Sequence, residues 1–154
     1  MADADLLRKV EEALTPLPSA SGGKAIVIAS ASSPPALAVL STGDVFLEGA
    51  SIRIALHGGS SASRRLEGGC SLLVPVRSGL LRVEVTPAKA RPAGPVDVIE
   101  GTVVSIRPTA EPPWIPTMAF SPAPSGDVAP TLEYWRSMRE WLRSGAAGDG
   151  PTPP

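Results

Sequence analysis

The 154-residue sequence predicts a mainly β protein: a small antiparallel sheet of six or seven strands, closed into a barrel, with one short inserted helix and a helix near each terminus. Two observations support this fold class. Short apolar runs follow one another at intervals too small for the helical crossovers of a parallel sheet. Longer stretches with apolar residues at helical spacing occur only near the two ends of the chain.

Composition argues against several classes of protein. The formal net charge is -1, no basic run is present and aromatic residues make up 4%, so a nucleic-acid-binding surface is not expected. The opening residues, MADADLLRKV, resemble neither a signal peptide nor a membrane span, and we expect a soluble cytoplasmic protein without membrane association. The single cysteine, Cys70, excludes an intramolecular disulfide and a thiolate zinc site, and no other metal motif is present.

The N-terminal part predicts one helix and three strands. Asp3 or Asp5 can cap a helix that ends before Pro16. The strands are expected over Lys24–Ser30, Ala36–Ser41 and Val45–Leu47, with Thr42–Asp44 as a hairpin-type connection between the last two.

The most informative stretch is Ser51–Val76. Its first seven residues alternate between apolar and more polar side chains, which predicts a strand with one buried face. Gly58 and Gly59 end this strand, and Ser60, Ser61 and Ser63 then suit the start of a short helix. The apolar run Cys70–Val76 predicts the next strand.

Two further strands and a proline-containing connection follow. Leu80–Thr86 alternates regularly, Pro87–Pro95 is interpreted as the connection, and Val96–Arg107 forms a long strand. The alternation slips around Ile99–Gly101, which predicts a β-bulge there. Asp97 and Glu100 on this strand are interpreted as part of a solvated face.

The C-terminal part divides into three segments. Pro108–Pro130 is too rich in proline for a helix or a central strand, yet Trp114, Ile115, Met118 and Phe120 suggest that it runs extended across a surface, such as that of a partner subunit. Thr131–Arg143 predicts an amphipathic helix, and residues 145–154 predict a disordered tail. We therefore expect a single domain over residues 1–144.

The glycine- and serine-rich turn allows two interpretations. A strand that ends in such a turn can present backbone N–H groups to an anion. Alternatively, the serines only cap the short helix, which is what serine does most often at this position. His57, the only histidine, is more often a polar residue at the rim of a sheet than a catalytic group.

The order of these elements, and the segment ALHGGSSASRRLEGGCSLLVPV followed by GLLRVEV, resemble the FMN-binding split β-barrel family, whose best-known member is pyridoxamine 5'-phosphate oxidase. The resemblance covers roughly residues 6–106. Ser60 would match the first serine of the family's turn and helix, Leu66 the helix leucine, and His57 the polar residue that ends the strand.

This resemblance implies a split β-barrel that binds FMN, or a related flavin, across a homodimer interface. The phosphate would be held by hydroxyls, backbone N–H groups and basic side chains of the turn. The cofactor-binding residues expected on this basis are His57, Ser60, Ser61 and Ser63, with Arg53 and Arg64 in place of the family's basic residues. The implied function is that of a flavin-dependent oxidoreductase that acts on a small molecule.

The sequence also departs from the family pattern. Ser61 and Ala62 stand where the oxidase has basic residues, no cation lies in Ala36–Ser41, and the oxidase's C-terminal arginine motif has no counterpart. Oxidase activity on pyridoxamine 5'-phosphate is therefore not expected. The alternative to a flavoprotein is a split barrel without a cofactor that serves as a dimeric binding or structural module.

Overall fold

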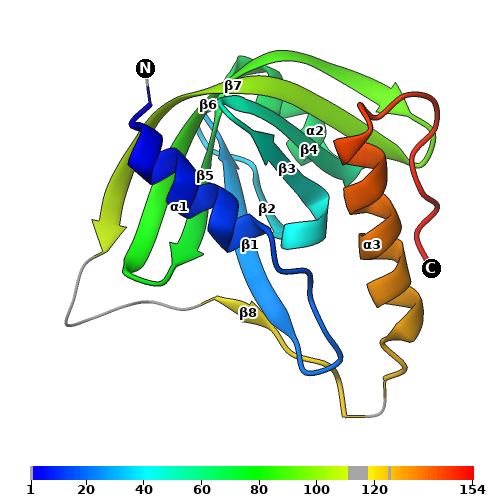
Figure 1. Ribbon diagram of the computed structural model, residues 1–154. Helices are drawn as coiled ribbons and strands as arrows, with labels where there is room; N and C mark the ends of the chain where they lie inside the picture. Colours follow the sequence, from blue (N-terminus) through cyan, green and yellow to red (C-terminus); the bar gives the residue numbers. More distant parts are fainter. Residues whose placement is uncertain (1, 111–117, 125) are drawn as a thin grey trace.

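The structure, a computed structural model, describes residues 2–110, 118–124 and 126–154. Eight strands form one sheet in which every pair is antiparallel, and the longest helices stand at the two ends of the chain, as the sequence predicts (Figure 1). The elements are α1 (Ala4–Leu14), β1 (Gly23–Ser30), β2 (Leu37–Ser41), η1 (Thr42–Asp44), β3 (Val45–Glu48), β4 (Ser51–His57), α2 (Ser61–Arg65), η2 (Leu66–Gly68), β5 (Cys70–Val76), β6 (Gly79–Ala93), β7 (Val96–Ala110), β8 (Ala119–Phe120) and α3 (Ala129–Arg143).

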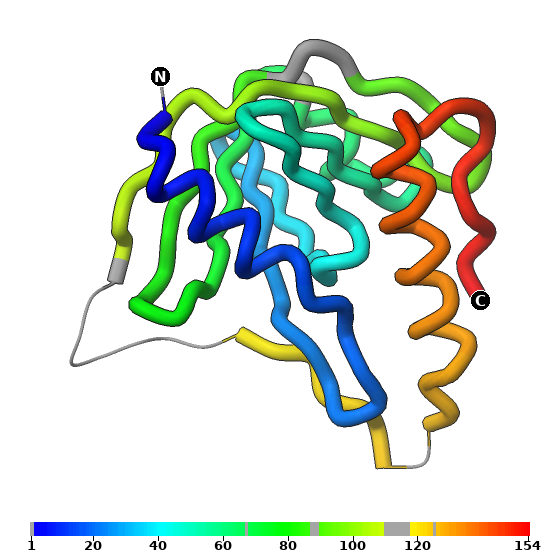
Figure 2. Tube along the Cα trace, in the orientation of Figure 1, coloured from blue at the N-terminus to red at the C-terminus, as the bar shows by residue number. Residues whose placement is uncertain are grey.

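The order of the strands curls the sheet. It runs β2-β1-β5-β6-β7-β4-β3, and β8 pairs with the start of β1. β2 and β3 therefore lie at opposite ends of this path, although only the three residues of η1 separate them in the chain. The sheet must bend back on itself to satisfy both conditions, which gives the split β-barrel that the sequence predicts (Figure 2).

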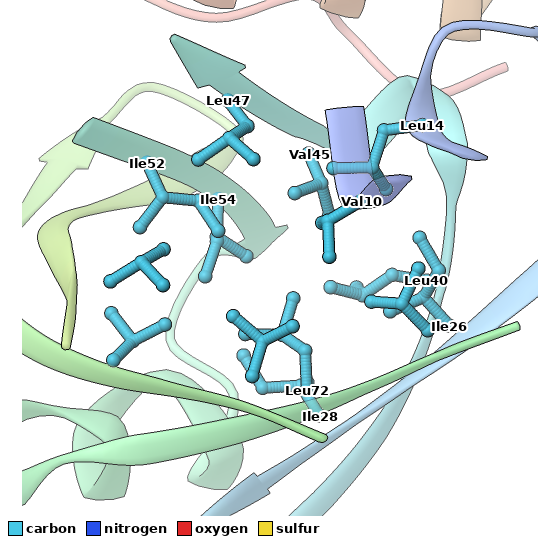
Figure 3. Packing of buried hydrophobic residues seen from close by; sticks show 14 of the residues in the cluster. Val10, Leu14, Ile26, Ile28, Leu40, Val45, Leu47, Ile52, Ile54 and Leu72 are labelled. Carbon is cyan, nitrogen blue, oxygen red and sulfur yellow. The ribbon is translucent and has the colours of Figure 1, made fainter. Parts of the chain in front are cut away.

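The inner face of the curled sheet holds the main hydrophobic core. Alternate residues of each strand point inward, among them Ile26 and Ile28 of β1, Leu72 of β5 and Ile54 of β4 (Figure 3). α1 contributes Val10, Ala13 and Leu14 to the same cluster, so this helix completes the core. The helix begins as predicted, because the Asp3 carboxylate accepts hydrogen bonds from the backbone N–H groups of Asp5 and Leu6 at 2.9 and 3.1 Å.

A second, smaller core lies between the outer face of the sheet and α3. Met138 and Leu142 are buried against Ala55 of β4 and Val96 and Val98 of β7. The predicted amphipathic helix over Thr131–Arg143 is confirmed and begins two residues earlier, with Pro130 in its first turn.

The connection over Thr42–Asp44 is not a hairpin, contrary to the expectation from sequence. β2 pairs with β1, and β3 pairs with β4. Between them, the Asp44 carboxylate accepts from the backbone N–H of Ser41 at 2.8 Å, and the Thr42 hydroxyl donates to the Pro16 carbonyl oxygen at 2.6 Å. These contacts hold η1 as a corner that joins the two edges of the sheet.

The predicted connection over Pro87–Pro95 is wrong in most of its length, because β6 continues to Ala93 and the turn is confined to Gly94 and Pro95. The last pair between β5 and β6 is Cys70 with Val85. Beyond it β6 has only β7 as a neighbour, and an edge strand tolerates proline because one side of it needs no hydrogen bonds.

An irregularity lies where the alternation slips around Ile99–Gly101, but its extra residue is on β6 and not on β7. Pro87 pairs with Gly101 and Lys89 with Glu100, while the β4–β7 ladder is regular through these residues. A second register shift lies at Glu84/Val85, where Val104 is the extra residue on β7.

The segment after β7 includes one short strand. Ala119 and Phe120 pair with Lys24 and Gly23, so this part of the proline-rich segment runs extended along β1. The predictions for Trp114 and Ile115 fall outside the described residues.

The C-terminal residues pack against the sheet, whereas their composition predicts disorder. Ala146 is fully buried, the Gly150 N–H donates to the Ala93 carbonyl oxygen at 2.9 Å, and the Trp141 indole N–H donates to the Ala147 carbonyl oxygen at 2.9 Å. The tail thereby covers the end of α3 and of β6.

Candidate functional site

The glycine- and serine-rich turn lies where β4 ends and α2 begins. The His57 carbonyl oxygen accepts from the Ser60 N–H at 3.2 Å, and Gly59 has a positive φ of 69°, which favours glycine. The Ser60 hydroxyl oxygen accepts from the Ser63 N–H at 3.2 Å and caps α2. The capping interpretation therefore holds for Ser60.

The Gly59 N–H and the Ser63 hydroxyl donate to a carboxylate of this same chain. Asp97, on β7, is paired with Leu56 at the end of β4. Its Oδ2 accepts from the Gly59 N–H at 2.9 Å and from the Ser63 hydroxyl through a short hydrogen bond. Ser63 is only 4% exposed, so this contact is shielded from water. Sequence reasoning placed Asp97 on a solvated face and did not connect it with the turn.

This arrangement does not fit the phosphate of FMN. A phosphate dianion bound to the Gly59 N–H and the Ser63 hydroxyl would have to displace the Asp97 carboxylate, and one bound beside them would lie next to a like charge. The turn thus has the geometry for an anion, and the chain supplies that anion itself.

Arg53 is directed away from the turn. Its Nη1 donates to the Leu142 carbonyl oxygen at 2.8 Å, its guanidinium carbon lies 5.9 Å from the centroid of the Phe46 ring, and its Nε is 4.0 Å from Glu100 Oε1. Arg53 precedes His57 by four residues, which along a strand is about 13 Å. This arginine therefore attaches α3 to β4.

Three other predicted residues lie on the surface around the turn. His57, Ser61 and Arg64 are exposed. Within residues 2–110, 118–124 and 126–154, no hydrogen bond or ion pair involves these three side chains. The structure thus brings Ser60, Ser61 and Ser63 together in one turn, with His57 and Arg64 beside it, but not Arg53.

A cluster of basic residues lies elsewhere, in a cavity of about 370 Å³ between α1 and the β5–β6 turn. Arg8, Lys9, Lys24 and Arg77 line it together with Glu12. Part of this charge is neutralised, because Arg8 pairs with Glu12 at 2.6 Å. The cavity is at the opposite end of β5 from the α2 turn, and nothing in the local sequence signals it, because only the fold joins its four basic residues.

A second cavity, of about 220 Å³, lies between β8 and α3. Phe120 and Trp135 line one part of it, and their ring centroids are 5.6 Å apart. The aromatic residues of the C-terminal helix therefore serve at least partly as packing, which is the usual role of tryptophan in such a helix.

An apolar patch is exposed on the outside of the sheet. Leu37 and Val39 on the edge strand β2 are 65% and 59% exposed. Val39 pairs with Val27 of β1, which pairs in turn with Leu73 of β5, so these side chains share one face. We call Val27, Leu37, Val39 and Leu73 the outer patch.

Buried titratable groups offer no activated nucleophile in the described part of the chain. Cys70 is buried, and burial, assisted by the charge of Glu84, raises the pKa of its thiol to about 11. Its thiol stays protonated and packs as a small apolar group.

No group of three or more histidine, cysteine or acidic side chains suited to a metal ion occurs among the described residues. None of the helices described is both long and apolar enough to cross a membrane.

Comparison with known proteins shows the fold. No family model matches the sequence, and no curated protein sequence matches it significantly. Among solved structures, an FMN-binding protein from Syntrophomonas wolfei is similar, with a TM-score of 0.52 and 13% identity over 70% of this chain and 88% of that one. The NADH:FAD oxidoreductase SgcE6 from Streptomyces globisporus C-1027 has a TM-score of 0.50 and 11% identity over 65% of this chain and 82% of its own. The same oxidoreductase in complex with NAD and FAD fragments also has a TM-score of 0.50, at 12% identity over 69% of this chain and 88% of that one. The chain thus shares the fold of these solved structures.

Proposed function

We propose that this protein is a homodimeric flavin-binding split barrel that acts as a flavin-dependent oxidoreductase. The observation that carries the proposal is the fold. The chain shares its fold with an FMN-binding protein and with an NADH:FAD oxidoreductase, over more than four fifths of the length of each. Both of these proteins are named for a flavin, which makes a flavin the ligand class most compatible with this scaffold.

The chemistry of the described residues is compatible with such a role. A flavin carries the electron-transfer chemistry itself, so the protein needs to bind and orient it but needs no nucleophile of its own. The buried thiol of Cys70 and the exposed position of the single histidine, His57, agree with that requirement.

The outer patch supports the homodimer. Monomeric proteins rarely leave large apolar side chains exposed on an edge strand, because such strands promote association. Leu37 and Val39 are both exposed there, and a two-fold axis would bring the same patch of two copies together.

A fluorescence titration with riboflavin and FMN tests the proposal. We expect saturable quenching of flavin fluorescence, and oxidation of NADH that depends on both the protein and an added flavin. A surface variant such as Ser137→Ala, on the exposed part of α3, should behave as the wild type. Absence of saturable binding of any flavin would contradict the proposal.

A second function is favoured by one observation. Because Asp97 uses donors of the α2 turn, the chain could serve as a cofactor-free dimeric binding or structural module. The same titration separates the two functions, because this second function predicts no flavin binding. It also predicts a melting temperature that riboflavin and FMN leave unchanged.

A further inference from the structure

We infer that the Asp97 carboxylate occupies the place of a ligand phosphate at the α2 turn. The turn therefore does not recognise the 5'-phosphate of a flavin, and the protein binds riboflavin as well as FMN. This inference rests on the proposed function for its ligand and names the substrate class of that function. The statement about the turn itself depends only on the contacts of Asp97.

Four donors of the turn and of the start of α2 already have acceptors within the chain. Asp97 Oδ2 accepts from the backbone N–H of Gly59 at 2.9 Å and from the hydroxyl of Ser63. The Ser63 N–H donates to the Ser60 hydroxyl oxygen at 3.2 Å, and the Arg64 N–H donates to the Ser60 carbonyl oxygen at 3.3 Å. A phosphate arriving at the turn would have to displace a carboxylate that already makes two hydrogen bonds.

Asp97 is held in place by the sheet. Its backbone lies in the regular β4–β7 ladder opposite Leu56, and it faces Pro92 of β6 on the other side. The carboxylate can leave the turn only by rotating its side chain, which would leave the nearly buried Ser63 hydroxyl without its acceptor. The rigid strand therefore favours the carboxylate over an external anion.

In the part of the chain that the structure describes, the basic side chains considered for a phosphate are engaged elsewhere or exposed to solvent. Arg53 is held by the Leu142 carbonyl oxygen and lies near Glu100. Arg65 Nη1 is 3.4 Å from the Pro34 carbonyl oxygen. Arg64 is exposed on α2, in water, where a charge contributes little to binding. A dianion at the turn would thus meet the negative charge of Asp97 with little compensation.

The first experiment compares equilibrium dissociation constants of the wild type for riboflavin and FMN in chloride buffer at fixed ionic strength. We expect the two values to agree within about threefold. A preference for FMN of about tenfold or more that disappears in Ser63→Ala would overturn the inference and leave flavin binding intact.

The second experiment needs no flavin, so it decides the statement about the turn even if the proposed function fails. Thermal unfolding of the wild type and of Ser63→Ala is followed in inorganic phosphate and in sodium chloride of equal ionic strength. We expect the two proteins to show the same change in melting temperature between the salts, within about 1 °C. A phosphate-specific stabilisation of several degrees in the wild type that Ser63→Ala removes would show that the turn binds phosphate, and would overturn the inference.

Discussion

At the scale of single residues, the hydrogen bond between Ser63 and Asp97 links the start of α2 to β7. Ser63→Ala leaves the Asp97 carboxylate with one fewer donor in a shielded position. We expect a loss of about 1.5–3 kcal/mol in the free energy of unfolding, the range for a hydrogen bond to a charged group. Urea unfolding measures it.

The matched control is Ser61→Ala, because Ser61 is the neighbouring serine of the same helix and is exposed. Its substitution should change the free energy of unfolding by no more than about 0.5 kcal/mol. Equal effects of the two substitutions would contradict the assigned role of Asp97.

Asp44 gives a prediction about pH. Burial raises the pKa of its carboxyl from 3.8 to about 6, although hydrogen bonds from Ser41 act in the opposite direction. The folded protein therefore binds this proton more tightly than the unfolded chain. The resulting stability is fully present below pH 3.8 and is lost as the pH rises through about 6.

Asp44→Asn tests this assignment, because the amide oxygen can still accept from the N–H and the hydroxyl of Ser41. Relative to the variant, the wild type should lose about 2 kcal/mol of unfolding free energy between pH 4 and pH 7. Urea unfolding at several pH values measures the difference. Parallel pH profiles for the two proteins would show that Asp44 does not titrate in this range.

The local sequence predicts the part of the site that caps α2. Ser60 follows a strand and a glycine pair and precedes a short helix, so its capping role is a local property. The contact of Asp97 is not local, since 34 residues separate it from Ser63 in the chain. Only the β4–β7 register brings the two together, and that register is set by the whole sheet.

At the scale of elements, Arg139 holds α3 against α1 and η1. Its guanidinium donates to the carbonyl oxygens of Leu14, of Thr42 at 2.5 Å and of Thr15 at 3.1 Å. A positive charge at the C-terminal end of α1 also complements the helix dipole. Burial lowers the pKa of Arg139, so these contacts must offset a desolvation cost.

Arg139→Met should therefore reduce the free energy of unfolding by about 2–3 kcal/mol, because it leaves these carbonyl groups without a donor while keeping much of the packing. Arg136→Met is the control, since Arg136 pairs only with Glu133 on the exposed side of α3, and its loss should cost less than about 1 kcal/mol. Chemical denaturation measures both. If Arg139→Met proves as stable as the control, α3 is held by its apolar contacts alone.

The sequence predicts the bounds of a strand or helix correctly where they depend on local residues. It predicts them wrongly where they depend on contacts with other elements. β4 and β5 have the predicted bounds, and a glycine marks one end of each, since Gly58 follows β4 and Gly69 precedes β5. β6 runs through Pro87 and Pro92, which a local rule assigns to a loop, because this half of the strand lies at an edge. Likewise, η1 is a corner because Thr42 bonds to Pro16, a contact across 26 residues.

At the scale of the whole molecule, the outer patch should mediate dimerisation. Val39→Lys places a charge in the centre of this patch without touching the core, because the Val39 side chain is 59% exposed. We expect the wild type to be a dimer and this variant a folded monomer at micromolar concentration, as measured by light scattering coupled to gel filtration.

Val104→Lys serves as the control, since Val104 is also an exposed valine, at 44%, but lies on β7, outside the patch. It should remain dimeric. A monomeric wild type, or dissociation by both substitutions alike, would contradict the role of the outer patch.

The barrel itself is foreseeable from the sequence, because short alternating strands with tight connections leave few alternatives to a curled antiparallel sheet. The joining of β2 and β3 through η1, and the basic cavity of Arg8, Lys24 and Arg77, are not foreseeable. They arise from contacts between elements far apart in the chain, for which the sequence pattern carries no signal.

The most direct test of the central claim, that this split barrel binds a flavin as a dimer, is gel filtration with light scattering on a column equilibrated with riboflavin. We expect a protein peak at twice the chain mass of 15.8 kDa that carries excess flavin absorbance above the baseline. A peak without excess flavin, in riboflavin and equally in FMN, would contradict the claim and favour the cofactor-free module.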